Sequence, residues 1–231
     1  MKKFELTSEF EIDFLGRELF RIKALVDIGR YCVKAGDLGG WVEKEDNLSQ
    51  IDDAWVSDDA WVCGNARVSG NAKVSGGAYV WGNAKVSGDA DVSGDAWISG
   101  DARVAGGADV SGNARVSGNA KVFGDAKVFG NARVSGNAQI HSGAHVCGNA
   151  WVCGNDDYAV IKGFGTVYRT TTFFRCHDGE VRVTCGCFYG TIDEFREQVK
   201  RTREGKVADE YLKIADLMEY HFKKEDSGEN V

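Results

Sequence analysis

Residues 101–124 read DARVAG-GADVSG-NARVSG-NAKVFG, four consecutive copies of one six-residue unit. The same spacing runs from Val56 to Val152, where valine or isoleucine recurs every six residues at 17 positions. Alanine stands two residues before each of them, and glycine stands two residues after 15 of them, Asp58 and Ser142 being the exceptions. A repeat of this kind indicates the architecture before any single element is considered.

Each unit predicts a short strand followed by a sharp turn. The alanine and the aliphatic residue point to the same face of a strand, so both enter a core while the residue between them faces outward. Glycine followed by Asn, Asp or Gly favours backbone angles that other residues resist, so the unit ends at a corner. Such short strands cannot bury a face alone, whereas stacked coils share one narrow core. An α-helix is excluded because a six-residue period does not match the 3.6 residues of a helical turn. We therefore predict a mainly β protein built on a parallel β-helix.

The segment from Asp53 to Asn155 resembles the hexapeptide repeat of left-handed β-helix proteins, in which three units form one triangular coil. The left-handed sense is implied by this resemblance alone. Seventeen units would make about 5–6 coils, or roughly 27 Å of stack at ~4.8 Å per strand. The flanking residues 39–43 and 47–49 are similar to the opening segment of uncharacterised bacterial and phage proteins with this repeat. Those proteins are often labelled acyltransferases or polymer-forming proteins from the repeat, which indicates fold more strongly than function.

The flanks predict two caps, which divide the chain into an N-terminal β cap (1–50), a β-helix (51–157) and a small α+β domain (158–231). In the first cap, alternating stretches on either side of Gly16 and Arg17 indicate an antiparallel hairpin.

In the last part, Asp178-Gly179 is a hairpin turn signal between residues 173–176 and 181–184. Thr191 opens a capping-box pattern, which predicts a helix from Ile192 to a stop at Gly205 and a second helix over 207–222. We expect residues 225–231 to be frayed.

The seven cysteines are odd in number and irregular in spacing, which argues against a disulfide framework and for a reducing compartment. Cys176 and the Cys185-Gly186-Cys187 run lack the second spaced pair of a zinc site, so we expect buried hairpin cysteines and no metal. Cys63, Cys147 and Cys153 occupy outward repeat positions that usually hold serine, and we interpret them as simple substitutions there.

Composition excludes several classes of protein. With 43% hydrophobic residues the chain is not broadly disordered, and a net charge of −7 from 28 basic and 35 acidic residues argues against general nucleic-acid binding. No apolar run approaches the roughly 18 residues of a membrane span, and the start leads into no signal-peptide core. We therefore expect a cytoplasmic protein with no membrane partner.

Residues 18 apart should stack on one face if three units make a coil. The position before each core aliphatic residue then gives a first column of Trp61, Tyr79, Trp97, Arg115, Arg133 and Trp151. Trp81 falls on the same face, beside Tyr79. Four large aromatic side chains would thus lie together at water-facing positions, which is unusual for a monomer surface. A second column is basic, with Arg67, Lys85 and Arg103.

This column has two interpretations. As a subunit interface it would hold a homotrimer, the state typical of the proteins that the repeat resembles. As a ligand platform it would stack a base on its rings and hold phosphates with Arg115 and Arg133. The interface is the more ordinary interpretation, and both hold together if the site lies between subunits.

His141 and His145 flank one corner of the repeat and bear on catalysis. Acyltransferases with this repeat use a histidine as general base and coenzyme A as acyl donor. They also extrude a loop that builds the acceptor pocket, whereas this repeat runs without interruption. We therefore assign no catalytic residue and no cofactor, and keep the two histidines and coenzyme A for the acyltransferase alternative.

The prediction is a non-enzymatic, trimeric binding protein that takes a nucleotide-like or other anionic small molecule. The phage proteins that it resembles suggest that it sequesters a nucleotide-like signalling ligand from a host defence. A structural or assembly scaffold is the first alternative, and a hexapeptide-type acyltransferase is the second.

Overall fold

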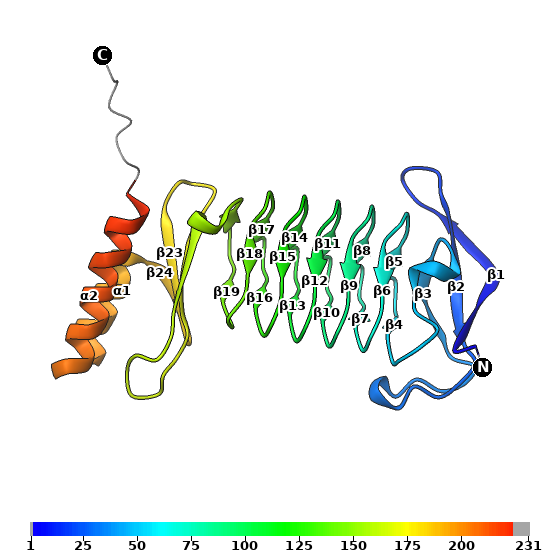
Figure 1. Ribbon diagram of the computed structural model, residues 1–231, viewed down its shortest axis with the longest axis horizontal. Helices are drawn as coiled ribbons and strands as arrows, with labels where there is room; N and C mark the ends of the chain where they lie inside the picture. The colour runs from blue at the N-terminus through cyan, green and yellow to red at the C-terminus, as the bar shows by residue number, and fades with distance from the viewer. Residues whose placement is uncertain (1, 224–231) are drawn as a thin grey trace, which may run out of the picture.

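The computed structural model describes residues 2–223; the predicted frayed end, residues 225–231, lies outside the described residues. The molecule is elongated, with the repeat forming a solenoid in the middle (Figure 1). Antiparallel strands lie at its N-terminal end, and an antiparallel sheet with two helices lies at the other.

The repeat forms 17 two-residue strands, each paired in parallel with the strand one coil away. They are β4 (Trp55–Val56), β5 (Trp61–Val62), β6 (Arg67–Val68), β7 (Lys73–Val74), β8 (Tyr79–Val80), β9 (Lys85–Val86), β10 (Asp91–Val92), β11 (Trp97–Ile98), β12 (Arg103–Val104), β13 (Asp109–Val110), β14 (Arg115–Val116), β15 (Lys121–Val122), β16 (Lys127–Val128), β17 (Arg133–Val134), β18 (Gln139–Ile140), β19 (His145–Val146) and β20 (Trp151–Val152). Trp97 pairs with Tyr79 on one side and Arg115 on the other, which is the predicted 18-residue register. The predicted parallel β-helix of about six turns is confirmed, and its left-handed sense stays a prediction.

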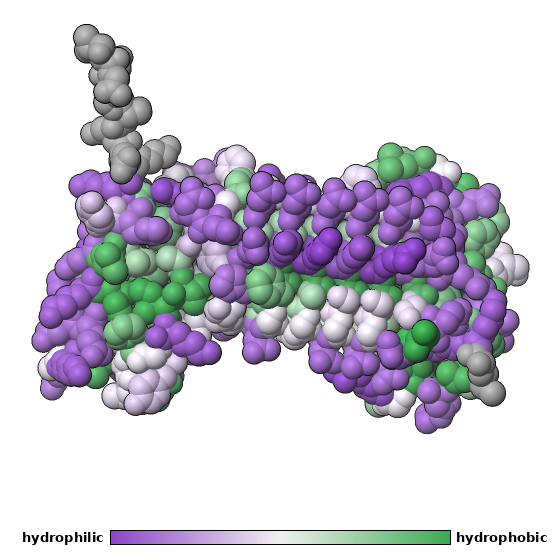
Figure 2. Space-filling view, viewed as in Figure 1, coloured by the Kyte–Doolittle hydropathy of each residue, from purple (hydrophilic) through white to green (hydrophobic). Residues whose placement is uncertain are grey.

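The strands make three parallel faces. The face of the first column is β5-β8-β11-β14-β17-β20, and we call it the first face. The second is β6-β9-β12-β15-β18, and the third is β4-β7-β10-β13-β16-β19. Because the register is regular, outward residues of similar hydropathy form rows along the solenoid axis (Figure 2).

The core contains the alanine and aliphatic residue of every unit, from Ala54 to Val152, and each is at most 1% exposed. This confirms the predicted inward positions. Fourteen of the 15 corner glycines have φ between +59° and +73°, while Gly154 at the end is extended. A Cβ at Gly100 would lie 3.0 Å from the backbone N and O of Gly118, so both conformation and stacking favour glycine.

The N-terminal cap continues the first face. Strands β1 (Phe4–Ile12) and β2 (Glu18–Ala24) form the predicted hairpin, and β3 (Leu38–Val42) pairs antiparallel with β2. On its other side β3 pairs in parallel with β5, which places Trp41 beside Trp61 at the head of the column. A short 3₁₀ turn over 29–31 lies between β2 and β3, and another over 45–47 lies between β3 and β4. The hairpin therefore protects the sheet edge that the first coil would expose.

The C-terminal segment covers the last coil. After a 3₁₀ turn over 155–157, it forms the sheet β21 (Tyr158–Ile161), β22 (Thr171–Arg175), β23 (Val181–Cys185) and β24 (Phe188–Thr191). Phe174 and Cys176 join the solenoid core, and a bridge pairs Cys176 with Ala150. The predicted hairpin around Asp178-Gly179 is confirmed by the β22–β23 pairing.

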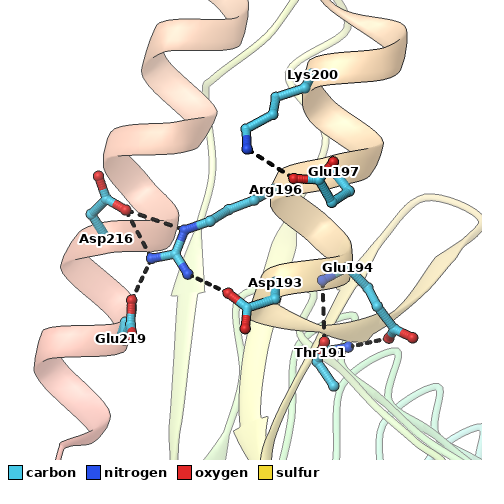
Figure 3. A network of polar contacts seen from close by, with 8 residues as sticks. All are labelled: Thr191, Asp193, Glu194, Arg196, Glu197, Lys200, Asp216 and Glu219. Carbon is cyan, nitrogen blue, oxygen red and sulfur yellow. Dashed lines mark hydrogen bonds and ion pairs between the residues drawn. The ribbon is translucent and has the colours of Figure 1, made fainter.

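Helices α1 (Ile192–Thr202) and α2 (Gly205–Phe222) complete this segment. Thr191 Oγ1 accepts a hydrogen bond from Glu194 N, and Glu194 accepts one from Thr191 N, as the capping box predicts (Figure 3). Arg196 of α1 joins both helices through ion pairs with Asp216 and Glu219 (Figure 3). Gly205 begins the second helix rather than ending the first. Among the described residues, no helix is long and apolar enough to cross a membrane.

Candidate binding face

The structure brings the aromatic residues of the first column into contact. Ring centroids of Trp61 and Tyr79 are 5.9 Å apart, and those of Tyr79 and Trp97 are 5.4 Å apart. The Trp81 ring lies 6.3 Å from Tyr79. These spacings are typical of favourable tilted aromatic pairs.

The expectation that all four rings face water is wrong. Tyr79 is only 5% exposed, while Trp61 and Trp81 are half-buried. The tip of the β1–β2 hairpin folds over them, with the Phe14 ring 5.5 Å from Tyr79 and 6.1 Å from Trp97. The cover comes from the chain itself, because the hairpin extends the same sheet and its tip is long enough to lie on the neighbouring coils.

A buried polar network fastens this tip. Arg17 donates from Nη2 to the Tyr79 hydroxyl (2.7 Å) and from Nε to Asp13 Oδ2 (2.7 Å). The Tyr79 hydroxyl donates to Asp13 Oδ2 (2.8 Å), and Asp13 Oδ1 accepts from the backbone N of Leu15 and Arg17. Burial alone would raise the pKa of Asp13, but the hydrogen bonds from Arg17, Tyr79 and Leu15 lower it to about 2.

Cys63 belongs to the same network. Its Sγ donates to the Tyr79 hydroxyl (3.3 Å), and the residue is fully buried with Trp41 and Tyr79 at its outward repeat position, because the N-terminal cap covers it. Burial raises the pKa of this thiol, and burial with the Cys63 and Asp13 hydrogen bonds raises the pKa of Tyr79. Both groups therefore stay protonated at neutral pH, which suits a structural contact.

The sequence contained a signal for the cover. Phe14 and Leu15 are large apolar residues immediately before Gly16, at the tip of a predicted hairpin. A hairpin tip usually holds small polar residues, so two apolar ones indicate that the tip packs against something. What it packs against could not be read from the local sequence.

The rest of the first face stays open, and we call Trp97, Arg115, Arg133 and Trp151 the open strip. Trp97 is 36% exposed and Trp151 is 42% exposed. The Arg115 guanidinium lies over the Trp97 ring at 5.4 Å, a cation–π distance. At the other end the ring of His177 stacks on Trp151, with centroids 4.7 Å apart and an interplanar angle of 11°.

A hollow of about 370 Å³ lies at the C-terminal end of the open strip. It is lined by Asn131, Arg133, Asn149, Ala150, Trp151, His177 and Asp178. The backbone N of His177 donates to the Asn149 carbonyl (3.2 Å), which positions the β22–β23 turn beside the last coil. In the described part of the chain, no carboxylate lies within 4.0 Å of Arg115 or Arg133.

The two histidines of the acyltransferase alternative lie on other faces. His141 follows β18 of the second face, and its Nδ1 is 2.6 Å from Ser142 Oγ. His145 lies in β19 of the third face, where burial and the nearby Lys127 lower its pKa. Neither belongs to the open strip.

Of the hairpin cysteines expected to be buried, Cys176 is buried and Cys185 is partly buried, whereas Cys187 is exposed, so the prediction is wrong for Cys187. Cys147 and Cys176 are buried, and burial raises the pKa of each to about 11. Cys153 is exposed as predicted. Within residues 2–223, no group of three or more His, Cys, Asp or Glu side chains is arranged to hold a metal ion.

Comparison with known proteins supports the fold. The family described as the YdcK beta solenoid repeat matches residues 60–76 and 126–142, each about one coil of the repeat. The chain is thus similar to β-solenoid repeat proteins over those two segments. No curated protein matches the chain.

Proposed function

We propose that the protein is a non-catalytic binding scaffold whose open strip holds a nucleotide-like anion. The observation that carries this proposal is the pair Arg115 and Arg133, which lack carboxylate partners among the described residues and lie between two exposed aromatic groups. Rings that stack on a base and guanidinium groups that hold phosphate are the combination that nucleotides require.

The spacing of the strip fits such a ligand. Arg115 and Arg133 stand on successive coils, so their backbones are about 4.8 Å apart and both can reach one phosphate group or two adjacent ones. Trp97 lies one coil before Arg115, and Trp151 lies one coil after Arg133. Phe14 and Arg115 already lie against the Trp97 ring, and His177 already stacks on Trp151. A base would therefore contact the exposed part of either ring or displace one of these neighbours.

The test is a matched pair of double variants measured by calorimetry against mononucleotides and cyclic dinucleotides. Arg115→Ala with Arg133→Ala should weaken binding by about 100-fold or more, since each charge-assisted hydrogen bond contributes about 1.5–3 kcal/mol. The control is Arg103→Ala with Lys121→Ala, which removes two exposed cations from the second face. Equal binding by both double variants, or no binding by the wild type, would refute the proposal.

Native mass spectrometry of protein purified from cells adds a test of catalysis. A sequestering protein should release its ligand chemically unchanged, and His141→Ala with His145→Ala should bind as the wild type does. The acyltransferase alternative expects coenzyme A turnover that is lost in the histidine variant. Unchanged release would also fit the proposed role of withholding a signal from a host defence.

A second candidate function is homotrimeric assembly, because apolar surface remains for a partner copy. Trp97 and Trp151 are exposed on the first face, and Phe123 and Phe129 are exposed on the other two. Light scattering should then give about 75 kDa, three times the chain mass of 25.1 kDa. A mass of one chain at micromolar concentration would exclude the trimer and leave the binding proposal standing.

A further inference from the structure

A second cavity, of about 370 Å³, lies in the C-terminal segment and is separate from the open strip. It opens between the loop before β22, the turn joining β23 to β24, and helix α1. The residues that line it include Arg169, Cys187, Phe195, Val199, Arg203 and Tyr211. Its volume is in the lower part of the range typical of small-molecule sites.

The floor of this cavity is apolar and is formed by buried core residues. Phe195, Val199 and Tyr211 are buried and belong to the core that packs α1 and α2 on the antiparallel sheet. The rings of Phe195 and Tyr211 meet edge to face at 5.8 Å. The Tyr211 hydroxyl donates to the Phe164 carbonyl (3.3 Å), which connects the loop to the floor.

The rim is basic and exposed. Arg169 comes from the loop and Arg203 from the end of α1, and both are exposed while lining the cavity. Arg169 lies directly against Gly186, where a Cβ would be 2.5 Å from its Nη1. The turn between Cys185 and Cys187 therefore leaves room for this guanidinium because residue 186 has no side chain.

The charges on the rim are not neutralised by the described residues. No aspartate or glutamate lines the cavity, and no carboxylate of residues 2–223 lies within 4.0 Å of Arg169 or Arg203. Burial raises the pKa of Tyr211, an effect that the nearby positive charges of Arg203 and Arg169 partly oppose. Two guanidinium groups thus converge near one phenol above an apolar floor.

We propose that this cavity binds a small organic anion, with its carboxylate or phosphate held by Arg169 and Arg203 and its apolar body on Phe195 and Val199. The arginine forks match the oxygens of either head group, and the floor excludes water from the body of the ligand. This inference does not depend on the proposed function, because the two sites share no residue.

The first experiment measures displacement of the fluorescent anion 8-anilinonaphthalene-1-sulfonate from the full-length chain. Octanoate and octyl phosphate should compete at least tenfold better than uncharged 1-octanol, and the better of the two identifies the preferred head group. In Arg169→Gln with Arg203→Gln this advantage should disappear. The control Lys200→Gln removes a cation of α1 that pairs with Glu197 and does not line the cavity, and it should keep the advantage.

The second experiment uses the free cysteines as internal reporters. Cys187 lines the cavity and is exposed, whereas Cys32 and Cys153 are exposed elsewhere. Octanoate should slow alkylation of Cys187 by iodoacetamide at least threefold and leave the other two rates unchanged. This measurement needs no variant, so it stands even if the arginine double variant fails to fold.

Two results would overturn the inference. One is equal competition by octanoate and octanol in the wild type, which would mean that the arginines do not select charge. The other is a Cys187 alkylation rate that octanoate leaves unchanged at saturating concentration. Loss of nucleotide binding in the Arg115 and Arg133 variants would bear on the open strip alone.

Discussion

The first face has an N-terminal half with Trp61 and Tyr79 and a C-terminal half with Arg115 and Arg133. The two halves have the same strand register, yet their side chains have different surroundings. In the N-terminal half, Trp61 and Tyr79 lie under the hairpin tip, and Tyr79 is held by Asp13 and Arg17. In the C-terminal half, Arg115 and Arg133 lie between exposed rings. One column of the repeat is therefore used for internal packing at one end and is left available at the other.

This difference shows that the position of a residue in the repeat determines the direction of its side chain but not how far that side chain is exposed to water. The residue before each core aliphatic points away from the solenoid axis, because its neighbours on both sides enter the core, and strand pairing keeps these residues in register along the column. Whether it then meets water depends on a segment far away in the chain. Arg17 reaches Tyr79 across 62 positions of sequence.

The largest expected difference between the halves is in the free energy of unfolding. Tyr79→Ala should cost about 3–5 kcal/mol, because it removes a buried ring and leaves a cavity beneath the hairpin. Trp151→Ala should cost only about 1 kcal/mol, the value of one exposed aromatic pair. Urea denaturation of both variants measures the two values. Equal costs would mean that the hairpin does not cover Tyr79 in solution.

The second prediction concerns the polar network. Asp13→Asn should cost about 1.5–3 kcal/mol, because the charged acceptor of several hydrogen bonds is lost. With its pKa about 2 in the fold and about 3.9 when unfolded, Asp13 contributes stability that is fully present above about pH 5 and is lost progressively as the pH falls through 2.

Unfolding of wild type and Asp13→Asn between pH 2 and 5 checks this pH dependence. The difference in stability between the two proteins should shrink steadily over that range as the pH falls. A difference that does not change with pH would contradict the lowered pKa of Asp13.

The third prediction tests what the halves share. Ala78 and Ala132 are fully buried in the same core, one beneath each half. Ala78→Leu and Ala132→Leu should each cost about 1–3 kcal/mol by overpacking, with no systematic difference between them. Thermal denaturation of the pair makes the comparison. If only Ala78→Leu were destabilising, the core would not be equally packed along the solenoid.

The smallest effect is expected at the arginines. Arg115→Ala and Arg133→Ala should change stability by no more than about 0.5–1 kcal/mol, since neither has an ion pair among the described residues and only Arg115 lies over a ring. The double variant should melt within a few degrees of the wild type. A large drop in melting temperature would show that these side chains support the fold, and the binding test would then need single substitutions.

Much of the architecture could be predicted because the repeat is local and strict. The spacing of Ala and Val determined which side chains enter the core, and the 18-residue register determined which outward residues stack. Corner glycines accounted for the turns, and Asp58 and Ser142 take the same left-handed conformation at φ +57° and +60°. The capping box at Thr191 likewise predicted the start of α1, because a cap depends on residues three positions apart.

The solenoid, its columns and the presence of a cap at each end could thus be predicted from the amino-acid sequence. The folded chain was needed to show that Phe14 and Arg17 cover Tyr79, that His177 stacks on Trp151, and that Arg169 and Arg203 line one cavity. The difference lies in how far apart in the sequence the residues that determine each feature are. Strand direction and turn angle depend on neighbours within six residues. The cover over Tyr79 and the second cavity depend on how each cap folds and packs against the solenoid, which no short period in the sequence encodes.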